Sequence, residues 1–359
     1  MNNPFVQDGF LCLNASINKL IIEKMPTDKV KQDLQGKAAL DIFSTELFIE
    51  EIKKNSKALK LDMDRIEEKM LPQYLNEGLE SDDILVKKIA DNIAKVFGER
   101  LAVILLTLKK GETVNRLKRE DWNDSNWDYW SSLKNVILVG GLSSSKIGEK
   151  LKFHVERVFK ESNENCYNII LNEDPSNSGI KGCATYIKGD EEEKLYLIFD
   201  CGQTFIKRSL IKIHEKEVKG IVKLGKVLSN YVEWDIQDSR KEKTQAVELH
   251  NYLLNLIIDT IEFGNEEVLN MGDHIVISIA NYVKNGLFAN RGGYGKLRLI
   301  AENYEECLSN ELYKKLGERF KISLVHDGTA MAAAFSNYEK SVCISLGTAF
   351  GVGFPNDIN

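Results

Sequence analysis

Two apolar runs near the C-terminal end of the chain each stop at a turn that contains glycine. The first, residues 324–326, leads directly into Asp327, a Gly-Thr pair and a run of small residues, 328–334. The second, residues 342–346, breaks into Gly-Thr-x-x-Gly-x-Gly over residues 347–353. A short apolar strand that passes at once into a small-residue helix is typical of α/β proteins. These junctions therefore predict an α/β fold.

The same residue types suit a phosphorylated ligand. Glycines let backbone N–H groups approach phosphate oxygens, and a helix N-terminus adds the positive end of its dipole. A carboxylate among such donors can accept a proton from an attacking hydroxyl, which makes Asp327 the candidate catalytic residue. Gly347 and Thr348 are candidates for phosphate contacts. Two ordinary strand-to-turn junctions would give the same short pattern, and this alternative stays open.

Composition limits the class of protein. The chain has 359 residues, of which 43% are hydrophobic and 28% charged, as in ordinary globular proteins. Its length predicts two lobes, because single cores stop growing at roughly 250–300 residues. The net charge of −6 argues against a general nucleic-acid binder, whose contacts depend on Lys and Arg.

Cysteine usage and hydropathy predict a cytoplasmic protein. The six cysteines form no Cys-x-x-Cys pair, and we expect reduced core residues rather than disulfides or zinc ligands. No apolar run reaches the about 18 residues that a membrane span needs, and the chain does not open on a signal peptide. We therefore expect no membrane association.

Two further strands end in the same manner. Residues 135–139 run into Gly140-Gly141, where a flat ligand can approach the backbone. Residues 195–199 deliver Asp200-Cys201-Gly202-Gln203-Thr204, after which a strand at 206–213 returns. An acidic residue beside Gly and Thr at such a turn can hold phosphate and, through water, Mg²⁺. A simple β-hairpin with an Asp-x-Gly turn is the alternative.

The rest of the chain predicts organisation more than chemistry. Ser81 is expected to cap a long helix over 82–108, whose apolar stripe from Ile84 onward is core, and Lys109-Lys110-Gly111 is expected to end it. The three tryptophans in 112–134 indicate a hydrophobic plug, or alternatively a carbohydrate- or base-stacking loop. Residues 281–295 are polar and glycine-rich, so we expect a mobile rim. Further helices are expected at 146–159, 242–264 and 303–318, further strands at 169–171 and 275–280, and a linker at 189–194.

Together the four motifs resemble those of the actin/hexokinase/Hsp70 ATPase superfamily. Residues 197–210 resemble its first phosphate loop, with an apolar strand, Asp-x-Gly-x-Thr and a second apolar strand. Residues 325–334 resemble the second phosphate segment of its sugar kinases, residues 345–353 the glycine turn that follows, and residues 137–145 the adenosine motif. The overall arrangement is similar to the repressor/open-reading-frame/kinase (ROK) sugar kinases. This resemblance implies two ribonuclease H-like lobes with the active-site cleft between them.

The order of the motifs differs from that of the family. The adenosine motif comes first here, and joining residue 359 to residue 1 restores the family order, which implies a circular permutation. Termini in surface loops tolerate such a rearrangement. The expected lobes are residues 1–188 with 340–359 on the adenosine side, and 189–339 on the phosphate and acceptor side. Strands in 340–359 are then expected to pair with strands from the first half.

The resemblance implies a kinase that uses ATP and Mg²⁺ to phosphorylate a hydroxyl of a small, sugar-like molecule. Asp327 would act as the base, and Asp200 would hold Mg²⁺ through water. The other nucleotide contacts implied are Gly202, Thr204, Gly347 and Thr348 at the phosphates, and Gly140 and Gly141 at the adenosine. A homodimer is compatible with the family.

Some residues depart from the family pattern. His326 stands where these kinases usually have Asn, and it either tunes Asp327 or makes a structural hydrogen bond. Lys207 either reaches a phosphate or is a surface lysine of its strand. The Glu-x-Gly-His segment with its cysteine cluster is absent, so no structural zinc is expected and the acceptor is not specified as a hexose. A nucleotide-binding regulatory or scaffold protein of the same fold, with little turnover, is the alternative function.

Overall fold

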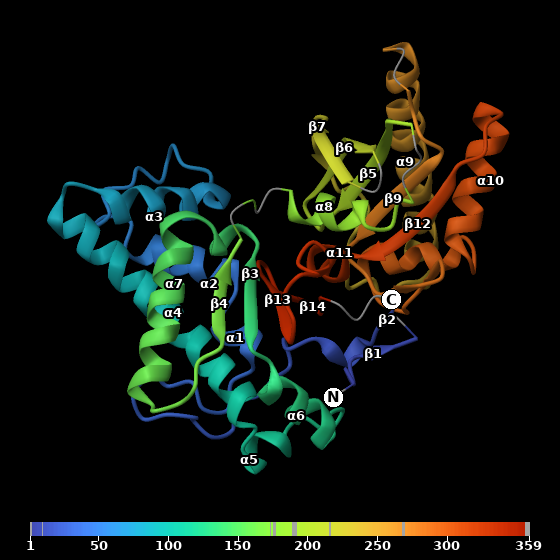
Figure 1. Ribbon diagram of the computed structural model, residues 1–359. Coiled ribbons are helices and arrows are strands. Elements are labelled where there is room, and N and C mark those ends of the chain that lie inside the picture. Colours follow the sequence, from blue (N-terminus) through green and yellow to red (C-terminus); the bar gives the residue numbers. More distant parts are fainter. Residues whose placement is uncertain are drawn as a thin grey trace. The chain divides into compact units, whose positions relative to one another are not determined.

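The computed structural model describes residues 2–8, 10–172, 174, 177–188, 192–214, 217–267 and 270–355. The chain forms two compact units, each with both helices and strands, so the predicted mixed α/β class is confirmed (Figure 1). Unit 1 takes in the described residues of Met1–Gln7, Leu13–Ser176 and Asn337–Asp357. Unit 2 takes in those of Asp8–Cys12 and Asn177–Ser336.

Unit 1 is mainly helical. Its helices are α1 (Ala39–Ile42), α2 (Thr45–Lys54), α3 (Leu71–Glu80), α4 (Ile84–Lys110), α5 (Thr113–Arg116), α6 (Asp124–Ser132) and α7 (Ser145–Glu161). Its 3-10 turns are η1 (Leu13–Ala15), η2 (Glu68–Met70) and η3 (Gly141–Ser143), and its strands are β1 (Val6–Gln7), β3 (Asn135–Val139), β4 (Asn168–Leu171), β13 (Ser341–Leu346) and β14 (Phe350–Gly353).

A four-stranded sheet in the order β14-β13-β3-β4 forms the centre of unit 1. β13 pairs in parallel with β3, so the C-terminal segment and the first half of the chain share one sheet (Figure 1). This is the strand pairing expected from the sequence. β3 pairs in parallel with β4, and β14 returns antiparallel to β13. The prediction of a glycine turn over 347–353 is therefore wrong in its length. Only residues 347–349 turn, and Gly351 and Gly353 lie within a strand.

The long predicted helix is present as α4, but its start differs from the prediction. Asp83, not Ser81, is the N-cap, because its carboxylate accepts hydrogen bonds from two backbone N–H groups of the first turn (2.9 and 3.2 Å). Ile84 and Leu85 were expected in the core, yet 83% and 59% of their surfaces are exposed. The helix ends as predicted at Gly111, which has a left-handed φ of 50°.

The tryptophan-rich segment is a hydrophobic plug, as the first of its two interpretations predicted. Trp122, Trp127 and Trp130 are buried, and their rings pack edge-on or stacked with one another and with Phe5 and Phe354. The cluster thus joins the N-terminal segment of unit 1, through Phe5, to its C-terminal segment, through Phe354. Its buried rings offer no exposed platform for a sugar.

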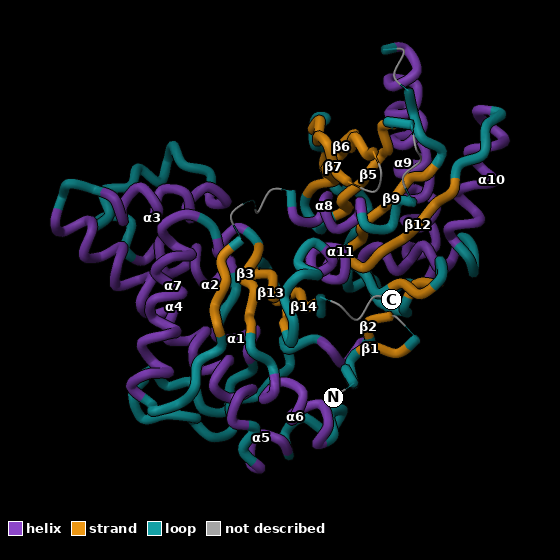
Figure 2. Tube along the Cα trace, viewed as in Figure 1, coloured by secondary structure: helices purple, strands orange, loops and turns teal. Residues whose placement is uncertain are grey.

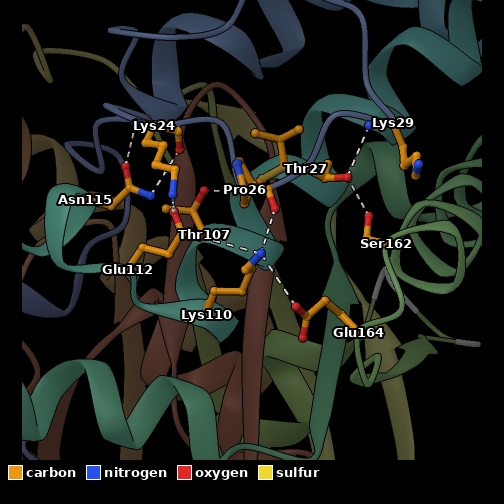
Figure 3. A network of polar contacts seen from close by, with 11 residues as sticks. Lys24, Pro26, Thr27, Lys29, Thr107, Lys110, Glu112, Asn115, Ser162 and Glu164 are labelled. Atoms are coloured by element: carbon orange, nitrogen blue, oxygen red, sulfur yellow. Dashed lines mark hydrogen bonds and ion pairs between the residues drawn. The ribbon is translucent and has the colours of Figure 1, made fainter.

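Polar contacts hold the segment at residues 24–26 against the end of α4 and the helix that follows it (Figure 3). The buried Asn115 side chain accepts a hydrogen bond from the backbone N–H of Lys24 (2.9 Å) and donates one to its carbonyl (3.1 Å). The Lys110 ammonium donates to the Pro26 carbonyl (2.9 Å). These contacts satisfy backbone groups that lack sheet partners.

Unit 2 contains a longer sheet with helices on both faces. Its helices are α8 (Ser178–Ala184), α9 (Ser239–Glu266), α10 (Tyr304–Leu316) and α11 (Asp327–Ala333), with the 3-10 turn η4 (Gly293–Leu299). Its strands are β2 (Phe10–Leu11), β5 (Lys194–Cys201), β6 (Phe205–His214), β7 (Glu217–Lys223), β8 (Val227–Leu228), β9 (His274–Ile279), β10 (Val283–Lys284), β11 (Leu287–Phe288) and β12 (Lys321–His326).

The main sheet of unit 2 has the order β12-β9-β5-β6-β7, with β8 paired to β6 (Figure 2). β5, β6 and β7 form an antiparallel meander, and β9 and β12 run parallel to β5. Alternate residues of β5 face opposite layers. Leu197, Phe199 and Cys201 pack with α9 and α10, whereas Tyr196 and Ile198 pack with α8 and α11.

Two predicted features of unit 2 need correction. Residues 281–295 are not a mobile rim, because Asn285 and Gly286 have positive φ (50° and 78°) and close a tight β10–β11 hairpin. Tyr294, at the end of that segment, is buried in the core. The predicted boundary at residue 188 also differs from the unit boundary, because α8 packs on α11 and β5 of unit 2. The predicted linker at 189–194 lies partly outside the described residues.

The other expected helices and strands are confirmed to within a few residues, as α7, α9, α10, β4 and β9. The assignment of the two units to an adenosine side and a phosphate side stays a prediction. In the part of the chain that the structure describes, no helix combines the length and apolar character needed to cross a bilayer.

Candidate functional site

The turn between β5 and β6 is held rigidly by neighbouring side chains. The Gly202 carbonyl accepts hydrogen bonds from the Ser229 hydroxyl (2.7 Å) and the Tyr294 hydroxyl (3.0 Å). The Gly202 N–H donates to the Phe205 carbonyl (3.1 Å), and the Thr204 carbonyl accepts from the Ser229 N–H (3.0 Å). The exposed Thr204 side chain thus stands on a fixed backbone.

Asp200 lies near the end of β5, on the sheet face that α8 and α11 cover. Strand alternation dictates this, because Tyr196 and Ile198 face the same way. Its cross-strand neighbour Lys207 pairs with it, with 2.9 Å between Nζ and Oδ2. The Ser278 hydroxyl of β9 lies 3.5 Å from Oδ1. The side chain of Asp200 is 20% exposed, so the carboxylate is still accessible from solvent.

Asp327 is the first residue of α11 and follows β12 directly. Its Oδ1 accepts a hydrogen bond from the Gly328 N–H (2.7 Å) and lies 3.2 Å from Nε2 of His326. Among the described residues, nothing donates a hydrogen bond to Oδ2, and 34% of the side chain is exposed. One carboxylate oxygen is therefore held while the other is open to a ligand. Burial raises the pKa of Asp327, and the charge of Asp200 raises it further.

His326 caps the helix that Asp327 begins. Its Nδ1 accepts a hydrogen bond from the Thr329 N–H (3.2 Å), a task for which Asn or Asp is the usual residue. Burial lowers the pKa of His326, so the ring is neutral near pH 7. Because Nδ1 is an acceptor, the proton of the neutral ring is on Nε2, which lies 3.2 Å from Oδ1 of Asp327. Both interpretations of His326, a structural hydrogen bond and an influence on Asp327, thus apply at once.

The two aspartates lie on one edge of the sheet. Asp200 aligns with Ser278 of β9, and Ser278 aligns with Val325 of β12, two residues before Asp327. All three strands are parallel, so their carboxyl ends meet at this edge. Two strand spacings across the sheet and two residues along it separate the aspartate backbones by roughly 12 Å. The gap is wide enough for a phosphoryl group to contact both carboxylates.

Small residues let α8 approach this edge closely. A Cβ on Gly182 would lie 1.5 Å from the Ala330 carbonyl oxygen, so α8 and α11 are in backbone contact there. A Cβ on Gly179 would lie 3.7 Å from Oδ2 of Asp200, an ordinary contact distance. The positions of Asp200 and Asp327 thus depend on the packing of these two helices.

The remaining predicted site residues meet at one edge of the unit 1 sheet. Gly140 follows β3 with a φ of 92°, and a Cβ there would lie 2.7 Å from the Leu346 carbonyl oxygen. Close packing against β13 therefore accounts for this glycine. Gly141 has open space around its α-carbon. Gly347 and the exposed Thr348 form the neighbouring β13–β14 turn, and the Gly347 carbonyl accepts a hydrogen bond from the Thr45 N–H (2.9 Å).

The structure thus gathers the predicted residues into two groups, one at the sheet edge of each unit. Four residues of the unit 2 group were not predicted, and they contact its turn, the Asp200 carboxylate or the His326 ring: Ser229, Ser278, Tyr282 and Tyr294. Ser278 had a recognisable signal, because it is a polar residue inside an otherwise apolar strand, 275–280. Ser229 and Tyr282 lie in loops and Tyr294 lies in the short 3-10 turn η4, so none of them belongs to a long periodic element that would indicate its direction.

A metal site in unit 2 would rest on a single carboxylate. Within the described residues, no three His, Cys, Asp or Glu side chains come together in a way that could hold an ion. Mg²⁺ usually keeps several waters and takes one or two carboxylates together with substrate phosphates. Asp200 fits that water-mediated role and does not fit an all-protein cage.

Comparison with known proteins identifies no family. No protein-family model matches the chain, and no curated protein matches it. Among solved structures, an exopolyphosphatase-like protein is similar to it at 12% identity and a TM-score of 0.28. The match covers 72% of this chain and 86% of the other. A TM-score this low supports no conclusion about fold or activity.

Proposed function

We propose that this chain is an ATP-dependent phosphotransferase that acts on a hydroxyl of a small, sugar-like acceptor. The observation that carries the proposal is the pair of carboxylates at one sheet edge of unit 2. Asp327 keeps one oxygen open, and Asp200 stands beside a rigid Gly-Thr turn. Phosphoryl transfer needs this combination of a base, a phosphate cradle and a metal-orienting carboxylate.

Asp327 acts as the base in this proposal. Its open Oδ2 accepts the proton of the acceptor hydroxyl as the acceptor oxygen bonds to the γ-phosphorus. The bond from that phosphorus to the bridging oxygen breaks, and ADP leaves with the electron pair. The raised pKa of Asp327 strengthens it as a base, while the Gly328 N–H keeps Oδ1 occupied and the neutral His326 lies beside it.

Asp200 would hold Mg²⁺ through water, and the Gly202–Thr204 turn would present N–H and hydroxyl groups to phosphates. When bound, the metal neutralises charge on the phosphates. Lys207, now paired with Asp200, would exchange partners with a phosphate bound beside that carboxylate. In unit 1, Gly141 and Thr348 are the accessible members of the adenosine-side group.

The sheet orders support the proposed fold of two ribonuclease H-like lobes. Unit 2 has a three-stranded antiparallel meander followed by two parallel strands, each reached through a helix. Unit 1 has a shorter version, with a two-stranded hairpin and two parallel strands. The circularly permuted order of the motifs, the cytoplasmic location and the homodimer stay predictions.

A nucleotide-binding regulatory protein without turnover is the second candidate. The Lys207–Asp200 ion pair favours it, because the ammonium occupies the oxygen that a hydrated Mg²⁺ would contact. A binder needs no base, so the open oxygen of Asp327 favours the phosphotransferase.

The test is ADP release with Mg·ATP across a panel of sugars and polyols, for wild type and Asp327→Asn. Asp273→Asn is the matched control, since Asp273 is exposed and precedes β9 at the opposite edge of the same sheet. We expect release that depends on an acceptor, falls at least about 100-fold in Asp327→Asn and persists in Asp273→Asn. Tight nucleotide binding with no such release would select the regulatory candidate.

A further inference from the structure

The Arg291 guanidinium in unit 2 lies over two aromatic rings, those of Tyr282 and Trp234. Its guanidinium carbon lies 5.4 Å from the ring centre of Tyr282 and 5.6 Å from that of Trp234. Both distances are within the range of cation–π attraction. The backbone fixes this stack, because Gly292 and Gly293 are pressed against Trp234, where a Cβ on either would lie within 3.0 Å of it. The guanidinium is thus held against two rings, and the residue is exposed to solvent.

Within the residues that the structure describes, no acidic side chain neutralises the charge of Arg291. Among the described residues, its side chain forms neither an ion pair nor a hydrogen bond, and the residue is exposed. The nearby Arg298 differs, because it pairs with Glu242 at 2.8 Å. A pre-oriented guanidinium without a carboxylate is suited to a planar, bidentate anion.

Arg291 is linked to the proposed base through a continuous stack. The ring of Tyr282 lies on the ring of His326, with 4.5 Å between centres and 22° between planes. His326 in turn contacts Asp327. The charge of Arg291 contributes to the lowered pKa of His326, which places it within electrostatic reach of this group. The phosphate side of the edge has its own cation, Lys207, on Asp200.

We propose that Arg291 binds an anionic group of the acceptor, so that the substrate is a phosphorylated or carboxylated polyhydroxy compound rather than a neutral sugar. The proposal rests on the proposed function, because it assigns a substrate class to the same site. Carboxylate and phosphate share the bidentate geometry that a guanidinium recognises. The anion belongs to the acceptor and not to ATP, since Arg291 lies near Asp327, whereas the phosphate side of the sheet edge is at Asp200.

The experiment compares matched acceptors that differ in one anionic group. Glucose is paired with gluconate for the carboxylate and with glucose 6-phosphate for the phosphate. Wild type, Arg291→Met and Arg291→Lys are measured for binding by calorimetry and for ADP release. Arg319→Met is the matched control, because Arg319 also stacks on an exposed tyrosine, 4.7 Å from Tyr313, at the end of α10.

Wild type should bind one anionic acceptor more tightly than glucose. Arg291→Met should lose about 10- to 100-fold in affinity for that acceptor, the range expected for a lost hydrogen bond to a charged group. Arg291→Lys should fall between them, since lysine keeps the charge but not the bidentate fork. Arg319→Met should match wild type, and the KM for ATP should not change.

Several results would overturn the proposal. One is equal binding of the neutral and the anionic acceptors by wild type. Another is equal affinity of wild type and Arg291→Met for the anionic acceptor. The third is an Arg291→Met protein whose KM for ATP rises instead. If anion binding depends on Arg291 but no acceptor releases ADP, the anion site stands and the proposed phosphotransferase fails. If neutral acceptors release ADP equally in wild type and Arg291→Met, the phosphotransferase stands and the anion site fails.

Discussion

Gly182→Ala should separate the two helices on which the unit 2 site depends. An added Cβ would lie 1.5 Å from the Ala330 carbonyl oxygen, and Cβ atoms essentially never come within 3.0 Å of such an atom. The helices must therefore move apart by at least the difference, 1.5 Å. Because Asp327 begins α11, the movement also displaces the proposed base.

The expected loss of folding stability depends on the atom that the new Cβ would meet, the Ala330 carbonyl oxygen. Overpacking a core usually costs about 1–3 kcal/mol, and a backbone carbonyl cannot rotate away as a side chain can, so the upper end applies. Alanine is favoured over glycine in a helix by about 1 kcal/mol. The free energy of unfolding should therefore fall by about 2 kcal/mol. A shift of this size at a catalytic group costs about 100-fold in kcat/KM.

Urea denaturation followed by circular dichroism measures the stability change, and ADP release measures the activity. Gly179→Ala is the matched stability control, since it makes the same change in the same helix at a position with ordinary contact distances, 3.7 Å or more. Gly179→Ala should be neutral or stabilising by up to about 1 kcal/mol. Stabilities of the two variants within about 0.5 kcal/mol of each other would refute the close packing of α8 on α11.

Three further predictions test other parts of the structure. Trp130→Ala should lower the free energy of unfolding by about 3–5 kcal/mol in thermal or urea unfolding. It should leave the KM of any acceptor unchanged, because the ring is buried in the hydrophobic plug and does not bind a sugar; an altered KM would refute this. Burial lowers the pKa of His154 to about 4, so the unfolded chain binds its proton more readily. Stability should therefore fall by up to about 1.4 kcal/mol per unit as the pH drops from 6.5 to 4, more steeply than in His154→Met, and identical slopes would contradict it. Since the pKa of Asp327 is raised, the acidic limb of the kcat/KM profile should lie above the usual aspartate range. It should move higher in His326→Phe, because His326 lowers the pKa of Asp327 electrostatically; a limb that moves lower would contradict this effect.

Periodicity explains what the sequence could predict. Strands such as β5 and β12 are short apolar runs that end in Asp and Gly, and both their existence and the carboxylates at their ends were readable. α4 was readable from its apolar stripe and its C-terminal glycine. The buried tryptophans followed from the residue type alone.

Contacts between distant segments explain what the sequence could not predict. Nothing near Gly202 indicates that Ser229 and Tyr294 donate hydrogen bonds to its carbonyl, because these residues come from two segments that are distant in the sequence. The Lys207–Asp200 pair required the exact hairpin register. The choice of Asp83 over Ser81 as a cap depended on a difference of two residues in where the helix begins, which propensities do not resolve.

The most direct test of the account is transfer of the labelled γ-phosphoryl group of ATP to an acceptor, in wild type and in Asp327→Asn with nucleotide binding measured in parallel. The account predicts labelled acceptor with wild type, its loss in Asp327→Asn, and unchanged ATP affinity, because Asp327 serves the acceptor hydroxyl and not the nucleotide. Label that appears equally with both proteins, or ATP bound and never transferred to any acceptor, would contradict the assignment of Asp327 as the base of a phosphotransferase.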